Sequence, residues 1–120
     1  MPIIKAKNHF LGLSDHKRMN CAQAIVAAFA KEYNIDETTV EDFKHFGGGR
    51  APDGLCGAYF AARHILRQYH SDKEKDFEDH FKSSCGSDIC REIKVKHKVS
   101  CLVCVEKCAE YLSQICISGK

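Results

Sequence analysis

The chain has 120 residues, with 18 Lys and Arg against 16 Asp and Glu. This length suits one domain with a modest core, so we expect residues 1–120 to form a single domain with an N-terminal extension over 1–13. The balanced charge does not indicate nucleic-acid binding. No run approaches the roughly 18 apolar residues of a membrane span, and the N-terminal stretch lacks the apolar segment of a signal peptide. Composition therefore predicts a cytoplasmic protein that binds neither nucleic acid nor membrane.

Helical periodicity dominates the first third of the chain. Ser14 is a suitable N-cap for a helix over residues 14–34, in which apolar residues recur at helical spacing. A second helix is expected over residues 36–46, with Asp36 or Thr38 as its N-cap.

The rest of the chain is also predicted to be mostly helical. A Pro-Asp-Gly turn over residues 52–54 precedes a helix over 55–68, and a more polar helix follows over 71–84. The last helix is expected to begin near residue 97 or 100 and to end near 115. Period-2 alternation, which is typical of strands, occurs only over residues 92–99. We therefore predict an all-α fold, a single compact bundle of about five helices.

Cysteine is the most informative residue type. Eight cysteines are many for an intracellular protein of this length, because structural disulfides are rare in the cytosol. Such thiols more often serve metal or redox chemistry, although we expect about half to be small core residues. The eight are Cys21, Cys56, Cys85, Cys90, Cys101, Cys104, Cys108 and Cys116.

The stretch FGGGRAPDGLCGAYFAA places one thiol directly after a glycine-rich loop. With Asp53 or Gly54 as N-cap, Cys56 falls in the first turn of a helix, where the unpaired N–H groups favour a thiolate. The loop residues Gly47, Gly48 and Gly49 would let the backbone approach a cofactor, with Arg50 nearby. The alternative is a plain loop followed by a buried cysteine, because the stretch matches no nucleotide-binding motif.

Three further cysteines share one face of the last predicted helix. Cys101, Cys104 and Cys108 follow the pattern C-x-x-C-x-x-x-C. This face is the apolar one, so we expect Cys104 and Cys108 to be core residues. An unbroken helix separates Cys101 and Cys108 by roughly 10 Å, so one helix cannot supply a whole metal site. Cys90 is predicted, like Cys56, to lie in the first turn of a helix.

Four stretches together resemble a known family. NCAQAIVAAFA, FGGGRAPDGLCGAYFAA, GSDICREI and CLVCVEKCAEYL are similar, in order and spacing, to the C_GCAxxG_C_C family of putative redox-active proteins. The resemblance covers roughly residues 19–112. Related segments resemble the iron–sulfur part of split-Soret cytochromes. Two features differ from the family pattern: Gly57 follows Cys56 rather than preceding it, and Ala61 stands where the motif ends in Gly.

The resemblance implies that the pattern cysteines are Cys21, Cys56, Cys90 and Cys101, and that such a fold can hold a cluster. We therefore expect a redox-active protein in which these four cysteines converge on an iron–sulfur cluster, with [2Fe–2S] favoured, or on zinc. Its role would be electron transfer or redox sensing with an unidentified redox partner. The remaining cysteines are extra to the pattern, and their part stays open: Cys85, Cys104, Cys108 and Cys116.

Two alternatives need no cofactor. The first is a cluster-free thiol–disulfide oxidoreductase with Cys56 as nucleophile and Cys90 or Cys101 as the resolving thiol. The second is a helical interaction protein with inert buried thiols. A homodimer stays open in each case.

Overall fold

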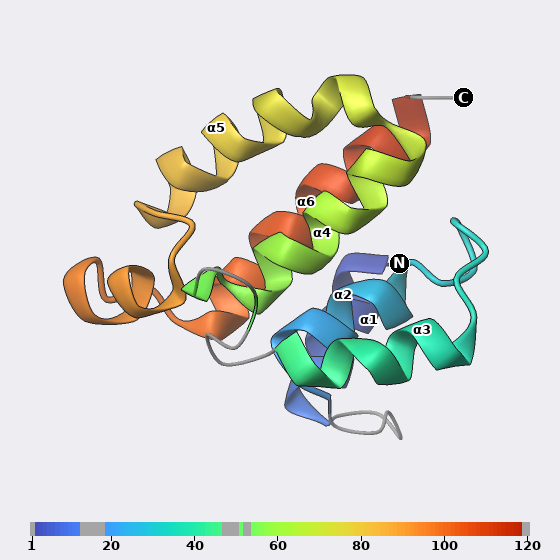
Figure 1. Ribbon diagram of the computed structural model, residues 1–120, viewed down its shortest axis with the longest axis horizontal. Helices are drawn as coiled ribbons and strands as arrows, with labels where there is room; N and C mark the ends of the chain where they lie inside the picture. The colour runs from blue at the N-terminus through green and yellow to red at the C-terminus, as the bar shows by residue number, and fades with distance from the viewer. Residues whose placement is uncertain (1, 13–18, 47–50, 52–53, 119–120) are drawn as a thin grey trace.

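The structure is a computed structural model that describes residues 2–12, 19–46, 51 and 54–118. Within these residues six α-helices and one π-helical turn pack into a bundle, joined by two short 3-10 turns (Figure 1). The all-α prediction is confirmed, with seven helices in the described part of the chain instead of about five. None of these helices is long and apolar enough to cross a membrane.

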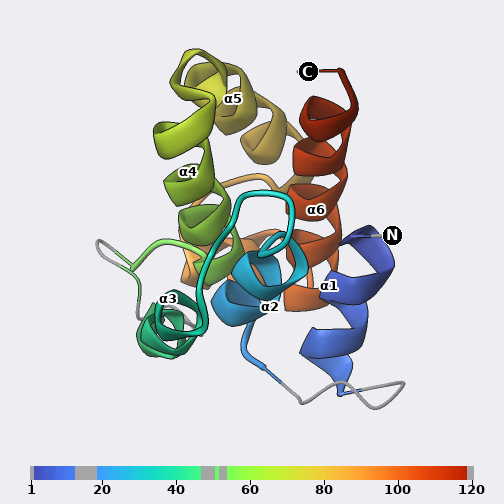
Figure 2. The same ribbon diagram turned by 90° about the vertical axis from the view of Figure 1, so that its right-hand side faces the viewer.

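The bundle begins with α1 (Pro2–Leu11), which lies beside α2 (Cys21–Ala28) and α6 (Figure 2). Ala6 of α1 is fully buried, so part of the predicted N-terminal extension belongs to the core. Asn20 is the N-cap of α2: its Oδ1 accepts a hydrogen bond from the Gln23 N–H at 2.8 Å. The helix therefore begins at Cys21, later than predicted. Ser14, the predicted N-cap, lies outside the described residues.

A short second pair of elements covers one side of α2. Asp36 is the N-cap of α3 (Glu37–Asp42), because its Oδ1 accepts a hydrogen bond from the Thr39 N–H at 2.9 Å. The 3-10 turn η1 (Phe43–Phe46) follows directly and buries Phe43. Of the two predicted N-caps for this region, Asp36 is the one that the structure shows.

The centre of the bundle is α4 (Gly57–Tyr69), which lies between α2 and α6. Its small residues Ala58, Ala61 and Ala62 are fully buried, which lets the neighbouring helices approach closely. After the 3-10 turn η3 (Ser71–Lys73) comes α5 (Glu74–Cys85), the more polar helix expected from the sequence. An aromatic pair joins α4 and α5, since the Tyr59 and Phe77 rings stack with centroids 5.4 Å apart.

Residues 92–99, the one segment whose alternation is typical of a strand, do not form a strand. Residues 92–96 form the π-helical turn η4 (Glu92–Lys96), and α6 (Cys101–Ser118) follows. Only Ile93 of this alternating segment is fully buried, whereas the Val95 side chain is 71% exposed. A strand would bury every second side chain of this segment. Because only one apolar side chain is buried, the segment adopts a helical conformation instead.

Candidate thiol site

The cysteines gather from several elements. Of the seven whose side chains the structure describes, six are buried and Cys101 is partly exposed, and all seven are free thiols. Cys116 lies outside the described side chains, and the predicted loop residues Gly47, Gly48, Gly49 and Arg50 lie outside the described residues. Their predicted roles are therefore not addressed by the structure.

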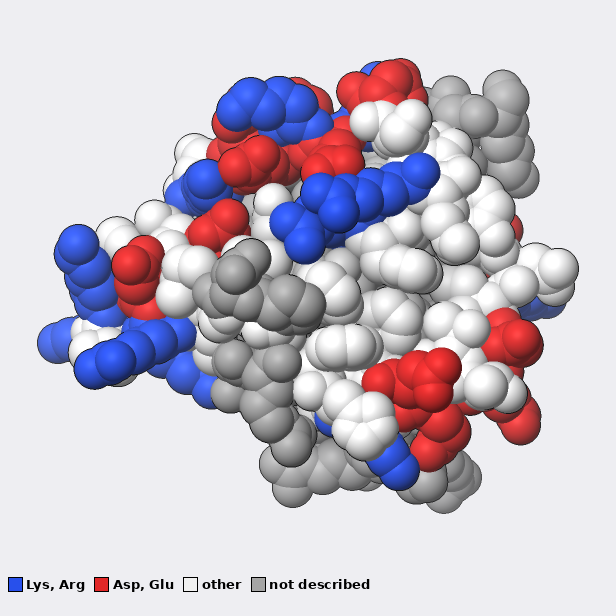
Figure 3. All heavy atoms as spheres, in the orientation of Figure 1, with Lys and Arg blue, Asp and Glu red and all other residues white. Residues whose placement is uncertain are grey.

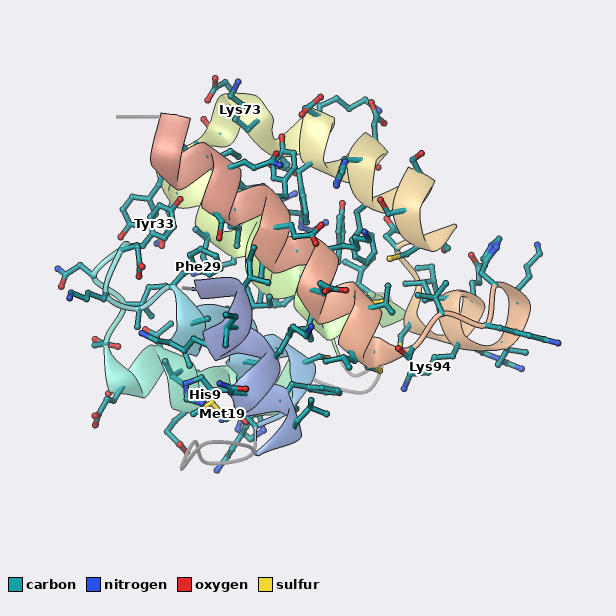
Figure 4. All side chains as sticks on the ribbon, turned by 180° about the vertical axis from the view of Figure 1, so that it is seen from behind. His9, Met19, Phe29, Tyr33, Lys73 and Lys94 are labelled. Atoms are coloured by element: carbon teal, nitrogen blue, oxygen red, sulfur yellow. The ribbon has the colours of Figure 1, made fainter. Side chains whose placement is uncertain are left out.

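A small cavity of about 10 Å³ lies where α4, η4 and α6 begin. This volume is about that of one water-sized sphere. Three of the four pattern cysteines line it together with Cys104 and with Lys94, which Figure 4 shows near the start of α6. The lining thiols are those of Cys56, Cys90, Cys101 and Cys104. The structure therefore brings most of the predicted cysteine set to one place.

Two loop segments build this cavity by pairing with each other. Leu55 and Ile89 form an isolated antiparallel bridge, and the Cys56 N–H donates to the Asp88 carbonyl oxygen at 2.8 Å. Cys56 and Cys90, one residue further along each segment, then begin neighbouring helical segments. Cys56 is itself the N-cap of α4, one position earlier than the first turn that the sequence predicts.

The end of α5 is held close to the same segment. Gly86 ends α5 in the left-handed region, with φ of 88°. A Cβ at this position would lie 2.4 Å from Cγ of His97, so only glycine permits this approach. The close contact fixes the end of α5, and with it Cys85, against the segment that carries Cys90.

Lys94 is the cation of the site. A hydrogen bond with Cys101 is the main cause that raises the pKa of Lys94. Charge interactions with the Cys90 and Cys21 thiols raise it further. The Lys94 charge also helps to lower the pKa of the Cys56 thiol. One ammonium group therefore interacts electrostatically with all four pattern cysteines, including Cys21, which does not line the cavity. Lys and Arg side chains are prominent at the left of Figure 3, the end of the molecule where Figure 1 shows the segment around η4.

Cys104 connects two other thiols. Its single S–H group is shared between two acceptors, the Sγ of Cys85 across 3.9 Å and the Cys56 thiol. The bond from Cys104, aided by the N–H groups of Tyr59 and Ala58, lowers the pKa of Cys56 despite its burial. The helix-start argument therefore predicts the right direction but names only a secondary cause. Hydrogen bonds to its two partners raise the pKa of Cys104, which stays a protonated donor.

Two other thiols favour the neutral form, whereas the hydrogen bond from Cys104 lowers the pKa of Cys85. Burial raises the pKa of Cys90 and also that of Cys108, which is fully buried in α6. Cys108 is a core residue, as its position on the apolar face predicts. Cys104 is also buried, but the sequence reasoning missed its place at the thiol cavity. Its position one helical turn from Cys101 was the available signal.

The donor set can be compared with what a metal requires. It consists of sulfur alone, which suits zinc or an iron–sulfur cluster. Among the described residues, however, no three Cys, His, Asp or Glu side chains are grouped closely enough to hold a metal ion. The chemistry of the donors fits a soft metal, while the thiols as they stand are spread around Lys94.

A helical bundle that collects free thiols at one end defines a cysteine-rich, all-helical class of protein. Within this class, the chain belongs to the family described as "Putative redox-active protein (C_GCAxxG_C_C)", whose model matches residues 19–115. This match confirms the resemblance expected from the four stretches. Comparison with curated proteins gives no match, and comparison with solved structures gives none.

Proposed function

We propose that this protein is a redox protein whose centre is a thiolate-held metal, either an iron–sulfur cluster or zinc, with iron favoured by a redox role. The ligands would be Cys21, Cys56, Cys90 and Cys101. The observation that supports the proposal is the shared cavity: three of these thiols, from different elements, line it beside Lys94. The fourth, Cys21, interacts with the same ammonium group.

Burial favours electron transfer or redox sensing over chemistry on a large substrate. Cys56 and Cys90 are buried, and buried thiols react poorly with bulky reagents. A bound iron–sulfur centre would supply an electron-accepting couple without requiring a substrate to touch sulfur. The chain would supply the four thiolates and a dry, apolar wall from Ile93 and Val99, while Lys94 offsets part of their negative charge.

Cluster-free thiol–disulfide chemistry is the second candidate, favoured by the surroundings of Cys56. Its thiolate is stabilised by Cys104 and by two backbone N–H groups at the start of α4. In this reading Cys56 is the nucleophile. Cys90 or Cys101 was the resolving thiol expected from the sequence, but the hydrogen bond between Cys104 and Cys56 favours Cys104 for this role.

Metal analysis of anaerobically purified protein tests the proposal. We expect visible absorbance with bound iron and sulfide, or bound zinc, in the parent chain. Cys108→Ala is the matched control, because Cys108 is buried on the same helix as Cys101 but outside the cavity, and it should keep the metal. Serine variants of the four ligands should each lose it: Cys21→Ser, Cys56→Ser, Cys90→Ser and Cys101→Ser.

The other outcomes decide between the alternatives. A metal-free protein in which Cys56 is alkylated rapidly near neutral pH contradicts the metal centre and supports thiol–disulfide chemistry. A metal-free protein whose thiols react only after unfolding contradicts both, and identifies a helical interaction protein with inert thiols.

A further inference from the structure

We propose that Cys85 and Cys104 form a second redox couple, a dithiol that a small peroxide oxidises to an intramolecular disulfide beside the thiol cavity. Neither residue belongs to the four-cysteine pattern of the family. The inference therefore goes beyond the proposed metal centre and does not depend on it.

The distance between the two sulfurs carries the inference. The Sγ atoms lie 3.9 Å apart, and the Cys104 thiol points at Cys85. A disulfide bond is about 2.05 Å long, so the sulfurs must approach by roughly 2 Å. Cys85 is the last residue of α5 and Cys104 lies in the first turns of α6, so the bond would join the ends of two helices.

Access to the pair determines the kind of oxidant. Cys85 and Cys104 are only 1% and 2% exposed, which shields them from bulky disulfides. Cys104 nevertheless lines the cavity that the partly exposed Cys101 also lines. This cavity accommodates a water-sized molecule, so hydrogen peroxide is a suitable class of oxidant.

The oxidation balances with peroxide as the only co-reactant. One sulfur, as the thiolate, attacks a peroxide oxygen, the O–O bond breaks, and a sulfenic acid and hydroxide form. The hydroxide takes up the proton that this thiol released and becomes water. The second sulfur then attacks the sulfenic sulfur: the S–S bond forms, the S–O bond breaks, and the second thiol proton leaves in another water. Two electrons pass from the two thiols to the peroxide.

The disulfide would act directly on the thiol cavity. It closes a loop over residues 85–104, the segment that carries Cys90, Lys94 and Cys101. It also removes the Cys104 thiol that hydrogen-bonds with Cys56. Oxidation would therefore constrain one wall of the cavity and change the surroundings of one pattern cysteine.

Peptide mapping of the full chain tests this inference. The reduced protein, purified anaerobically with whatever metal it holds, is treated with one equivalent of hydrogen peroxide, alkylated, denatured and digested. We expect a Cys85–Cys104 linked peptide and two fewer alkylatable thiols. Closing a loop of this length should also raise the melting temperature by about 10 °C. A link from Cys104 to Cys56 instead, or a Cys85 that stays alkylatable after oxidation, overturns the proposal.

Two variants separate this couple from the metal centre. Cys85→Ala should lose the linked peptide and the peroxide-dependent rise in melting temperature, whereas Cys108→Ala should keep both. Reduced Cys85→Ala should bind the same amount of metal as the parent chain. A disulfide without metal therefore contradicts only the proposed function, and metal without a disulfide contradicts only this inference. If Cys85→Ala does not fold, the map of the parent chain decides alone.

Discussion

The backbone N–H of Cys56 donates to the carbonyl oxygen of Asp88 at 2.8 Å, and this bond ties together the starts of two cysteine-bearing helical segments. The segment before Cys90 is shaped by Ser87, the residue that precedes Asp88. Ser87 Oγ accepts from the Ile89 N–H at 3.0 Å and donates to Glu92 Oε1 at 2.7 Å. Ser87 therefore holds the loop against which Cys56 is placed.

Ser87→Ala should lower the free energy of unfolding by about 1–2 kcal/mol, because the buried Ser87 hydroxyl makes two hydrogen bonds that the variant loses. Urea denaturation measures the change. Glu92→Gln is the matched control: it keeps an acceptor for Ser87 and should lose less. Equal losses in the two variants would contradict the assigned role of the Ser87 hydroxyl.

Gly86→Ala should destabilise the protein more than Gly54→Ala. Both glycines have positive φ, 88° and 73°, which costs an alanine about 1–2 kcal/mol. Only at Gly86 does the added Cβ also meet His97, at 2.4 Å; at Gly54 the nearest atom is 3.9 Å away. Overpacking should add at least about 1 kcal/mol at Gly86.

The double variant Gly86→Ala/His97→Ala isolates the steric part of that loss. Removing the ring should recover the excess over Gly54→Ala but not the cost of the positive φ. If the loss in the double variant equals the sum of the losses in Gly86→Ala and His97→Ala, the contact between the added Cβ and His97 does not contribute to the destabilisation.

Cys104→Ala and Lys94→Gln should both raise the pKa of Cys56, with the larger rise in Cys104→Ala. The hydrogen bond from Cys104 is the largest cause that lowers this pKa, and the Lys94 charge is a smaller one. The pH dependence of Cys56 alkylation by iodoacetamide, in reduced and metal-free protein, should therefore move to higher pH in both. Lys96→Gln, which removes a nearby exposed charge, is the control. The reverse order of the two shifts would disprove the hydrogen-bond assignment.

Arg67 and Glu74 should contribute a small, pH-dependent stabilisation. Two N–H groups of Arg67 donate to the two Glu74 carboxylate oxygens, each at 2.9 Å, and lower the pKa of Glu74. A carboxyl with a depressed folded-state pKa stabilises the fold above its unfolded pKa and loses this contribution as the pH falls through the folded-state pKa. The pair is largely exposed, so Arg67→Gln should cost less than about 1 kcal/mol at pH 7.

The measurement is the difference in unfolding free energy between the parent chain and Arg67→Gln at two pH values. The difference should shrink as the pH is lowered from 7 toward 3, and it should also shrink in high salt at pH 7. A difference that grows at low pH would contradict the pairing.

Local features of the fold could be predicted, because they depend on neighbours in sequence. The Asp36 N-cap is an example, since its hydrogen bond spans three residues. The start of α2 was equally local but was predicted too early. Asn20 and Gln23 form a reciprocal cap that the sequence N-C-A-Q contains, and this cap determines the first helical residue.

Tertiary features of the candidate site could not be predicted in this way. The partners of Cys104 come from α4 and α5, so its position on the apolar face of α6 indicates burial but not which thiols it meets. The pairing of Leu55 with Ile89 joins segments that are distant in sequence and have no alternating pattern of their own. Lys94 is one of several charged residues in an alternating segment, and nothing in that pattern indicates that this lysine lies beside the thiols.

The bridge between Leu55 and Ile89 has a consequence for the dynamics of the thiols. An opening that exposes the Cys56 amide must break its bond to Asp88, and so must also detach the segment that leads into η4. Such fluctuations belong to one cooperative unit rather than to a single fraying helix end. The amide protons of Cys56 and Ile93 should therefore exchange with solvent through a common opening, and the cavity is protected by the combined stability of both segments.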